Sequence, residues 1–104
     1  MIKNFDYMVR GGNIVARYPF KNIERKGRDE FLLEDEMDLV LQMLMKQNEI
    51  SKDGYGTIGI DEEDDTIYIM EVVTGNELWK ENDYSVYISN RSLKQIRKNE
   101  DDNS

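Results

Sequence analysis

The strongest constraint on the fold is a helical repeat of apolar residues between Asp29 and Asn48. Acidic residues gather near its beginning, where carboxylates interact favourably with the positive end of the helix dipole. We therefore predict one long amphipathic helix over 29–48. Its core-facing stripe is expected to contain the apolar residues that follow helical spacing: Leu33, Met37, Val40, Leu41 and Leu44.

A second apolar ridge runs along the same helix. Leu32, Leu39 and Met43 are displaced from the first stripe by about a quarter turn at ~100° per residue. Because the two ridges cover more of the helix than packing on one sheet requires, we expect the second to meet another segment or another molecule. The remaining face is expected to be acidic and solvated, and it carries Glu34, Asp35, Asp38, Gln42 and Glu49.

The N-terminal segment has the pattern of a β-hairpin. Strands are predicted over 2–9 and 14–18, joined by a turn that contains Gly11 and Gly12, because glycine reaches positive φ without a Cβ clash. Pro19 is expected to end the second strand, since it has no N–H to donate. Residues 20–28 are predicted to form a basic connecting loop.

A second hairpin is predicted around the acidic run 61–65, with strands over 55–60 and 66–73. Alternation places four isoleucines on one face, and we expect this face to contact the helix: Ile58, Ile60, Ile67 and Ile69. The opposite face is unusually apolar for a solvated surface, which suggests a second cover. Its residues are Tyr55, Thr57, Tyr68, Met70 and Val72.

The C-terminal third predicts a turn at 74–76, a short loop or helical turn with Leu78 and Trp79, and a last strand over 84–89. Asn90 is expected to cap a basic helix over 91–98 that Leu93 and Ile96 anchor to the core. The order ββ-α-ββ-β-α predicts an α+β fold, with a small antiparallel sheet of about five strands and one long helix packed on a face. We expect residues 1–98 to form a single domain and 99–104 a disordered acidic tail.

Missing residue types exclude several kinds of chemistry. The 104-residue chain has no cysteine and no histidine, so it lacks a thiol nucleophile, a thiolate metal site and the commonest general base. Because these residue types are missing, we predict that the protein is not an enzyme and needs no cofactor. Neither a signal peptide nor a membrane span is apparent, and we expect a soluble cytoplasmic protein.

Two groups of acidic residues are candidate metal sites. The run 61–65 fails the EF-hand pattern, because the loop glycine would fall at Thr66 and the closing glutamate at Val72. A divalent-metal nuclease site would have to draw on Asp65, Glu71, Glu77 and Lys80, whose spacing matches no nuclease motif. We predict no metal site, with the acidic run forming a solvated hairpin tip.

Charge is segregated along the chain. Residues 1–28 hold seven Lys or Arg and two acids, whereas residues 29–83 hold three Lys and seventeen acids, and the net charge is −8. Rows of carboxylates can imitate a polyphosphate and occupy a basic channel, so our leading hypothesis is an inhibitor or adaptor that binds a basic protein surface. The predicted partner-binding residues are Glu34, Asp35, Asp38, Glu49, Asp61, Glu62, Glu63, Asp64 and Asp65.

A short acidic α+β chain without catalytic residues resembles the inhibitors that phages and mobile elements encode against host nucleic-acid enzymes. The resemblance lies in size and charge and includes no sequence motif. It implies a nucleic-acid mimic with an anti-defence role, acting on a host nucleic-acid enzyme in the cytoplasm of the host cell.

Two alternatives remain open. The chain could be a structural or regulatory subunit that self-associates through its surplus apolar residues, namely Leu32, Leu39, Met43, Tyr68, Met70 and Val72. It could also bind nucleic acid through its basic N-terminal segment, in which aromatic residues are interleaved with Arg10, Arg17, Lys21, Arg25, Lys26 and Arg28.

Overall fold

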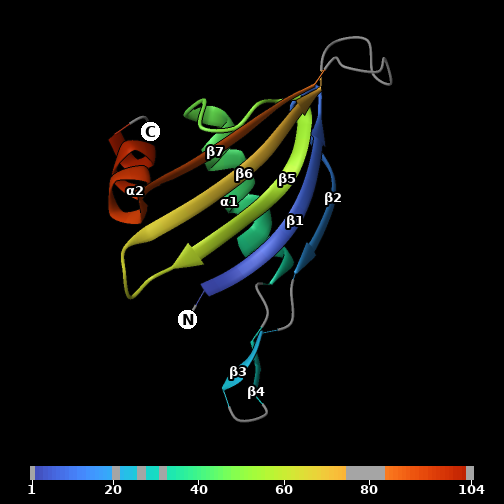
Figure 1. Ribbon diagram of the computed structural model, residues 1–104. Helices are drawn as coiled ribbons and strands as arrows, with labels where there is room; N and C mark the ends of the chain where they lie inside the picture. Colours follow the sequence, from blue (N-terminus) through green and yellow to red (C-terminus); the bar gives the residue numbers. More distant parts are fainter. Residues whose placement is uncertain (1, 20–21, 26–27, 31–32, 75–83, 103–104) are drawn as a thin grey trace.

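The computed structural model describes residues 2–19, 22–25, 28–30, 33–74 and 84–102. Its centre is a five-stranded antiparallel sheet in the order β2-β1-β5-β6-β7 (Figure 1). The strands are β1 (Ile2–Arg10), β2 (Asn13–Pro19), β5 (Gly54–Asp61), β6 (Thr66–Thr74) and β7 (Tyr84–Ser92). The predicted α+β class and the order of the main elements are confirmed.

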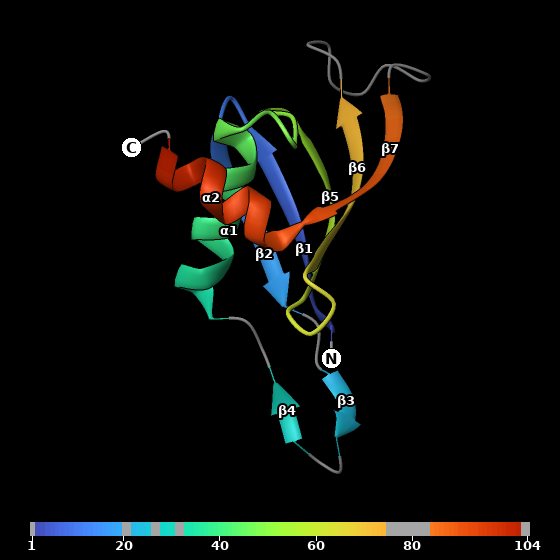
Figure 2. The same ribbon diagram turned by 90° about the vertical axis from the view of Figure 1, so that its left-hand side faces the viewer.

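Two helices, α1 (Glu34–Lys46) and α2 (Leu93–Asp102), lie side by side on the same face of the sheet (Figure 2). The core between these layers holds the four isoleucines that were predicted to face the helix. Met37, Leu41 and Leu44 of α1 pack against them, and all three are at most 1% exposed. Burial of apolar surface stabilises a fold by about 25 cal/mol per Å², so this interface holds the helices on the sheet.

The N-terminal hairpin forms as predicted. Gly11 and Gly12 have φ of +56° and +78°, a left-handed pair that suits a tight turn between twisted strands. Asp53 fixes the turn from outside, because its Oδ1 accepts the Gly11 N–H at 2.8 Å. β2 ends at Pro19, and a bulge lies near its middle, where Met8 pairs with Ala16 and Val9 with Ile14.

The start of the long helix differs from the prediction. α1 begins at Glu34 instead of Asp29, and Leu33 occupies the N-cap, with 68% of its surface exposed. Acidic residues are spread over 29–36, so the favourable interaction with the helix dipole did not single out one starting residue. The Glu36 carboxylate accepts the Leu33 N–H at 3.2 Å and thereby stabilises the later start. Leu33 is therefore not part of the core stripe, and Val40 is only partly buried.

The end of α1 lies within two residues of the prediction and has a clear physical cause. Asn48 adopts φ of +58°, and the N–H groups of Asn48 and Glu49 donate to the carbonyls of Met45 and Leu44 at 3.1 and 2.9 Å. This is the hydrogen-bond pattern of a Schellman motif, in which a left-handed residue ends the helix.

A small second sheet replaces part of the predicted loop and helix. β3 (Asn22–Arg25) and β4 (Arg28–Glu30) pair antiparallel and form a separate hairpin beyond one end of the main sheet (Figure 1). Pairing with β3 takes Asp29 and Glu30 out of the predicted helix. The prediction of a basic loop over 20–28 is therefore wrong for the strand residues.

The C-terminal strand and helix also have different bounds. β7 continues through Asn90 to Ser92, so the predicted Asn90 cap is wrong and Ser92 precedes α2 instead. The Ser92 hydroxyl accepts the Gln95 N–H at 3.2 Å. α2 runs to Asp102 and includes residues 99–102, which the sequence placed in an acidic tail.

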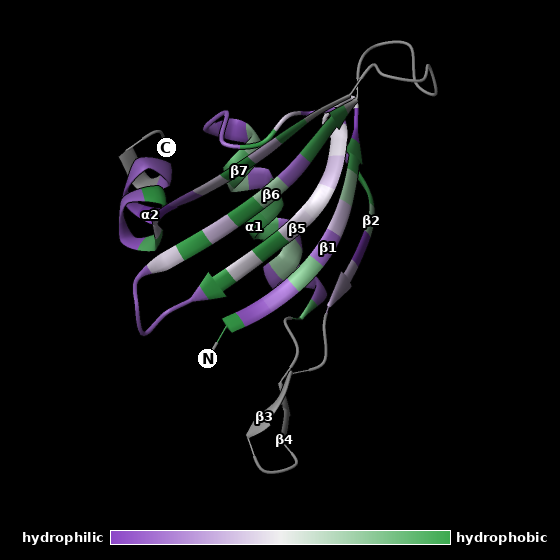
Figure 3. Ribbon diagram, viewed as in Figure 1, coloured by the Kyte–Doolittle hydropathy of each residue, from purple (hydrophilic) through white to green (hydrophobic). Residues whose placement is uncertain are grey.

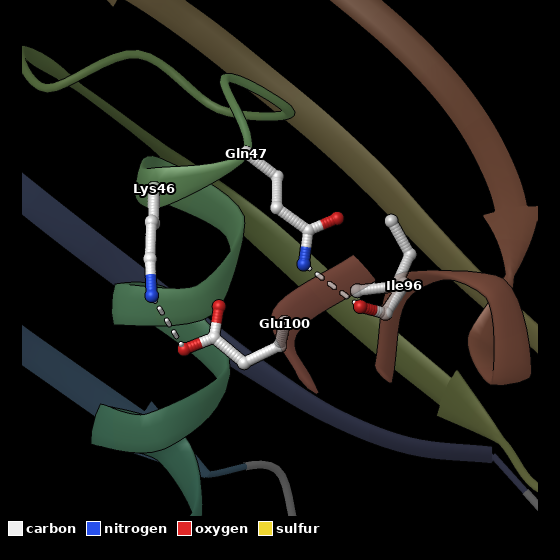
Figure 4. A network of polar contacts seen from close by, with 4 residues as sticks. All are labelled: Lys46, Gln47, Ile96 and Glu100. Atoms are coloured by element: carbon white, nitrogen blue, oxygen red, sulfur yellow. Dashed lines mark hydrogen bonds and ion pairs between the residues drawn. The ribbon is translucent and has the colours of Figure 1, made fainter. Parts of the chain in front are cut away.

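Contacts with α1 account for the greater length of α2 (Figure 4). Gln47 Nε2 donates to the Ile96 carbonyl at 2.7 Å, and Lys46 Nζ lies 3.4 Å from Glu100 Oε1. Leu93 and Ile96 are 2% exposed and anchor the helix as predicted. A helix this short is marginal in isolation, so tertiary packing sets its length.

Candidate binding surface

Acidic residues on and just beyond α1 pair with cations at both edges of the sheet. Arg17 of β2 lies 3.5 Å from Glu34 and 2.8 Å from Asp38, the latter an ion pair without hydrogen-bond alignment. Glu49, beyond the other end of α1, accepts from Arg91 of β7 at 3.0 Å. Since β2 and β7 are the two edge strands, the acids do not form one row facing a single partner.

The acidic turn 61–65 is also used within the fold. Asp61 is 7% exposed and accepts the Asp64 N–H at 3.1 Å, while Glu62 lies 3.2 Å from Arg97 of α2. Glu63 and Asp64 have exposed side chains, as does Asp35 on α1. Within the described ranges, no three acidic side chains come together in a geometry that could hold a metal ion.

Asp65 stabilises the start of α2. Its carboxylate accepts the Ser92 hydroxyl at 2.7 Å and the Lys94 N–H at 2.8 Å. The hydrogen bond from Ser92, followed by the one from Lys94, lowers the pKa of Asp65 below its usual value. Sequence reasoning assigned Asp65 to partner binding and did not detect this structural role, because Ser92 and Lys94 lie 27 and 29 residues away in the chain.

The residues proposed for self-association separate onto opposite faces. Leu39 is 66% exposed on the outer side of α1, and Met43 is partly buried against the core. Leu32 lies outside the described residues. Tyr68, Met70 and Val72 belong to the face of the sheet that the helices leave uncovered, so the two groups cannot form one continuous interface.

That uncovered face, which we call the open face, is built from three rows that cross the sheet. Strand register puts Ala16, Met8, Tyr55, Val72 and Val86 in the first row. The second row contains Tyr18, Asp6, Thr57, Met70 and Ile88. The third contains Asn4, Gly59, Tyr68 and Asn90. The first two rows consist mostly of aromatic and aliphatic residues. Along β6, more and less hydrophobic residues alternate (Figure 3).

The open face is almost free of charge. Asp6 is the one charged residue in the three rows, and its Oδ1 accepts the Thr57 hydroxyl at 2.6 Å. Met70 and Ile88 are 46% and 79% exposed, and Tyr18 and Val86 are exposed as well. Depletion of charge together with enrichment of aromatic residues and methionine is typical of the centre of a protein interface.

Two shallow hollows indent this face on either side of its middle row. One has a volume of about 370 Å³ and is lined by residues that include Asn4, Gly59, Tyr68 and Ile88. The other, of about 360 Å³, lies beside Tyr18 and Tyr55. Thr57 and Met70 line both hollows, so Met70 stands between them at the centre of the surface.

A buried polar row lies on the helix-covered side of the same strands. Tyr7, Gly56 and Glu71 are neighbours across β1, β5 and β6. Glu71 is 4% exposed and accepts the Ser51 N–H at 2.7 Å, and burial raises its pKa. Burial, and then the charge of Glu71, raises the pKa of Tyr7. Asp65 lies in the turn before β6, whereas Glu71 is five residues along the strand from Thr66, about 17 Å at 3.3 Å per residue. These two members of the nuclease set therefore do not converge, and Glu77 and Lys80 lie outside the described residues.

The sequence revealed only part of the open face. The alternation placed Tyr68, Met70 and Val72 on the face opposite the four isoleucines, and this is confirmed. A second cover was expected over that face, but neither described helix supplies it. Met8, Tyr18, Val86 and Ile88 were not singled out, because their contribution depends on which strands lie side by side. The alternation of Val86 and Ile88 was the available signal.

The basic N-terminal set is dispersed. Arg17 is held by α1, and Arg10 ends β1. Lys21 and Lys26 lie outside the described residues, whereas Arg25 and Arg28 belong to the β3–β4 hairpin.

No protein-family model, curated protein or solved structure matches this chain. Across the described part of the chain, no helix is long and apolar enough to cross a membrane.

Proposed function

We propose that this protein is a non-enzymatic adaptor or inhibitor that binds another protein on its open face. The observation that carries the proposal is the combination of exposed Tyr, Met, Val and Ile side chains with a near absence of charge. The largest apolar patch on an ordinary monomer is about 300–600 Å² and is often functional. Three residue rows across five strands have a projected area of this order, since strands lie about 4.8 Å apart.

The expected partner presents an apolar surface with few charges. The two hollows beside Met70 can each receive a protruding side chain, and the aromatic residues around them offer large contact areas at a low cost in conformational entropy. We expect the complex to form in the cytoplasm, which agrees with the absence of cysteine.

Two matched substitutions, each of which introduces one negative charge, test the proposal. Met70→Glu places a carboxylate at the centre of the open face, and Leu39→Glu places the same charge on the outer side of α1. The wild-type protein and both variants are used to capture partners from the native host, and each captured protein is then identified, purified and titrated. We expect Met70→Glu to weaken binding about thirtyfold or more, the cost of a hot-spot residue, while Leu39→Glu binds like the wild type. Equal binding by all three would refute the proposal.

The acidic nucleic-acid mimic remains a second proposal, supported by the net charge of −8 and by the exposed carboxylates of Asp35 and Asp64. Intramolecular ion pairs with Arg17, Arg91 and Arg97 argue against it, although exposed pairs of this kind are weak and can exchange partners. Salt distinguishes the two proposals. A complex held by the acids loses affinity steeply as ionic strength rises, whereas one held by the open face does not.

A further inference from the structure

The two edges of the sheet are protected to different degrees. β2 is shortened by Pro19, interrupted by a bulge opposite Met8, and held to α1 through Arg17. These features are the ones that natural sheets use to prevent pairing with another chain. β7 has no proline and no bulge, and its one charged residue, Arg91, lies near its C-terminal end, where it pairs with Glu49. Residues 84–90, YSVYISN, contain no charge, no proline and no glycine.

β7 is also long and exposed. It pairs with β6 from Ser92 to Tyr84, and no other described strand pairs with its outer edge. Val86, Tyr87 and Ile88 are 54%, 57% and 79% exposed. An edge strand whose first seven residues carry no charge and are rich in β-branched and aromatic side chains is a template for another strand.

We propose that β7 pairs antiparallel with β7 of a second copy of this chain, so that two sheets join into one of ten strands. The segment is self-complementary about Tyr87. A twofold axis at that position sets Val86 of one copy opposite Ile88 of the other, and Ser85 opposite Ser89. Residues opposite each other in an antiparallel pair point to the same face, so the open faces of both copies become continuous.

Charge favours this register over contacts elsewhere on the surface. Each copy has a net charge of −8, so two copies repel one another on average. Pairing along 84–90 brings no like charges into contact, and the remaining repulsion is screened beyond about 8 Å at physiological ionic strength. This inference goes beyond the proposed function, because dimerisation and partner binding can each fail without the other.

The oligomeric state provides the first test. Sedimentation equilibrium from low micromolar to several hundred micromolar protein should show the mass rising above the monomer value of 12.3 kDa. Ile88→Lys should raise the dissociation constant by about tenfold or more, because it places a charge beside an apolar partner residue. Leu39→Lys, an equally exposed site on α1, should behave like the wild type. A constant monomer mass throughout would overturn the proposal.

Engineered cysteines test the register, since the natural chain has none. Opposed residues of an antiparallel pair have Cα atoms about 4.5–5.5 Å apart, within disulfide range. Tyr87→Cys should therefore form a disulfide with itself under mild oxidation. Val86→Cys and Ile88→Cys should link efficiently only when the two variants are mixed. A dimer that links instead through Met70→Cys, or that Ile88→Lys leaves intact, would show a different interface and refute edge pairing.

Discussion

Gly56 provides the sharpest test of how closely the central strands approach. It lies on β5 between Tyr7 of β1 and Glu71 of β6. A Cβ at this position would overlap the Met70 carbonyl oxygen and lie 2.9 Å from its carbon and 3.0 Å from the Glu71 Cα. All three obstacles are backbone atoms, so Gly56→Ala has to move β6 away from β5.

The expected cost follows from that movement. Overpacking a core costs about 1–3 kcal/mol, and each weakened ladder hydrogen bond adds about 1 kcal/mol. We expect Gly56→Ala to lower the free energy of unfolding by about 3–4 kcal/mol. In a chain of this size, each kcal/mol shifts the melting temperature by about 4–8 °C, so the midpoint should fall by at least about 12 °C.

Gly59→Ala is the matched control on the same strand. Its Cβ would meet Asn4 Oδ1 at 2.6 Å and Ile2 Cγ2 at 3.2 Å, which are the ends of side chains that can rotate away. We expect Gly59→Ala to lower the free energy of unfolding by less than about 1 kcal/mol. The smaller backbone entropy of alanine in the unfolded chain offsets part of the steric cost. Urea and thermal unfolding followed by far-ultraviolet circular dichroism would measure both variants. Equal stability of the two would refute the close approach of β5 and β6 at Gly56.

Three further outcomes follow from the fold. Leu41→Ala should cost about 2–5 kcal/mol in urea unfolding because it empties a fully buried site, whereas exposed Leu39→Ala should cost less than about 0.5 kcal/mol. Asp65 has a lowered pKa, so its carboxylate stabilises the wild type above pH 3.8, and this stability is lost as the pH falls through the lowered pKa. Asp65→Asn should lack this component when thermal midpoints are measured over a pH series. If the midpoints of both proteins fall equally with acid, the prediction is wrong. Glu71 has a raised pKa, so the native state retains its proton more tightly, and wild-type stability should fall as pH rises from about 4.5 through that raised pKa. Glu71→Gln should abolish this fall over the same pH series, and its persistence would exclude Glu71 as the cause.

The sequence correctly predicted those strands and turns for which the turn residues and the hydrophobic periodicity indicate the same structure. Gly11 and Gly12 combine turn chemistry with apolar strands on both sides, and the hairpin forms there. Ile58 and Ile60 alternate with small or polar neighbours, and Ile67 and Ile69 occupy every second position of the next strand, so their face was evident before any partner strand was known. In each case the information lies within a few residues of the element, and burial adds to the same preference.

Features that depend on distant contacts were missed. The helix start moved to Glu34 because the preceding residues pair with β3, and α2 extends because Lys46 and Gln47 contact it. Glu71 was weighed only as part of a nuclease set that matches no motif, and its burial beside a glycine of the neighbouring strand was not predicted. The open face belongs to the same class, since five strands contribute to it and their lateral order is not a local property of the chain.

The structure also changes the meaning of the segregated charge. Ion pairs from Arg17, Arg91 and Arg97 join the acids of α1 and of the turn 61–65 to the sheet edges and to α2. Charge is thereby concentrated around the helices, while the open face and β7 remain nearly neutral. Another protein that covers those surfaces desolvates few charges, chiefly Asp6, whose carboxylate keeps its hydrogen bond from Thr57. Desolvation is the costly step in burying acidic residues. Association through the open face or β7 should therefore strengthen, or at least persist, as salt screens the repulsion between acidic molecules, whereas binding through the acids should weaken. The dissociation constant should therefore be measured at two ionic strengths. It should fall or stay constant at high salt if the neutral surfaces bind, and rise if the acids bind. A loss of affinity at high salt would assign function to the acids.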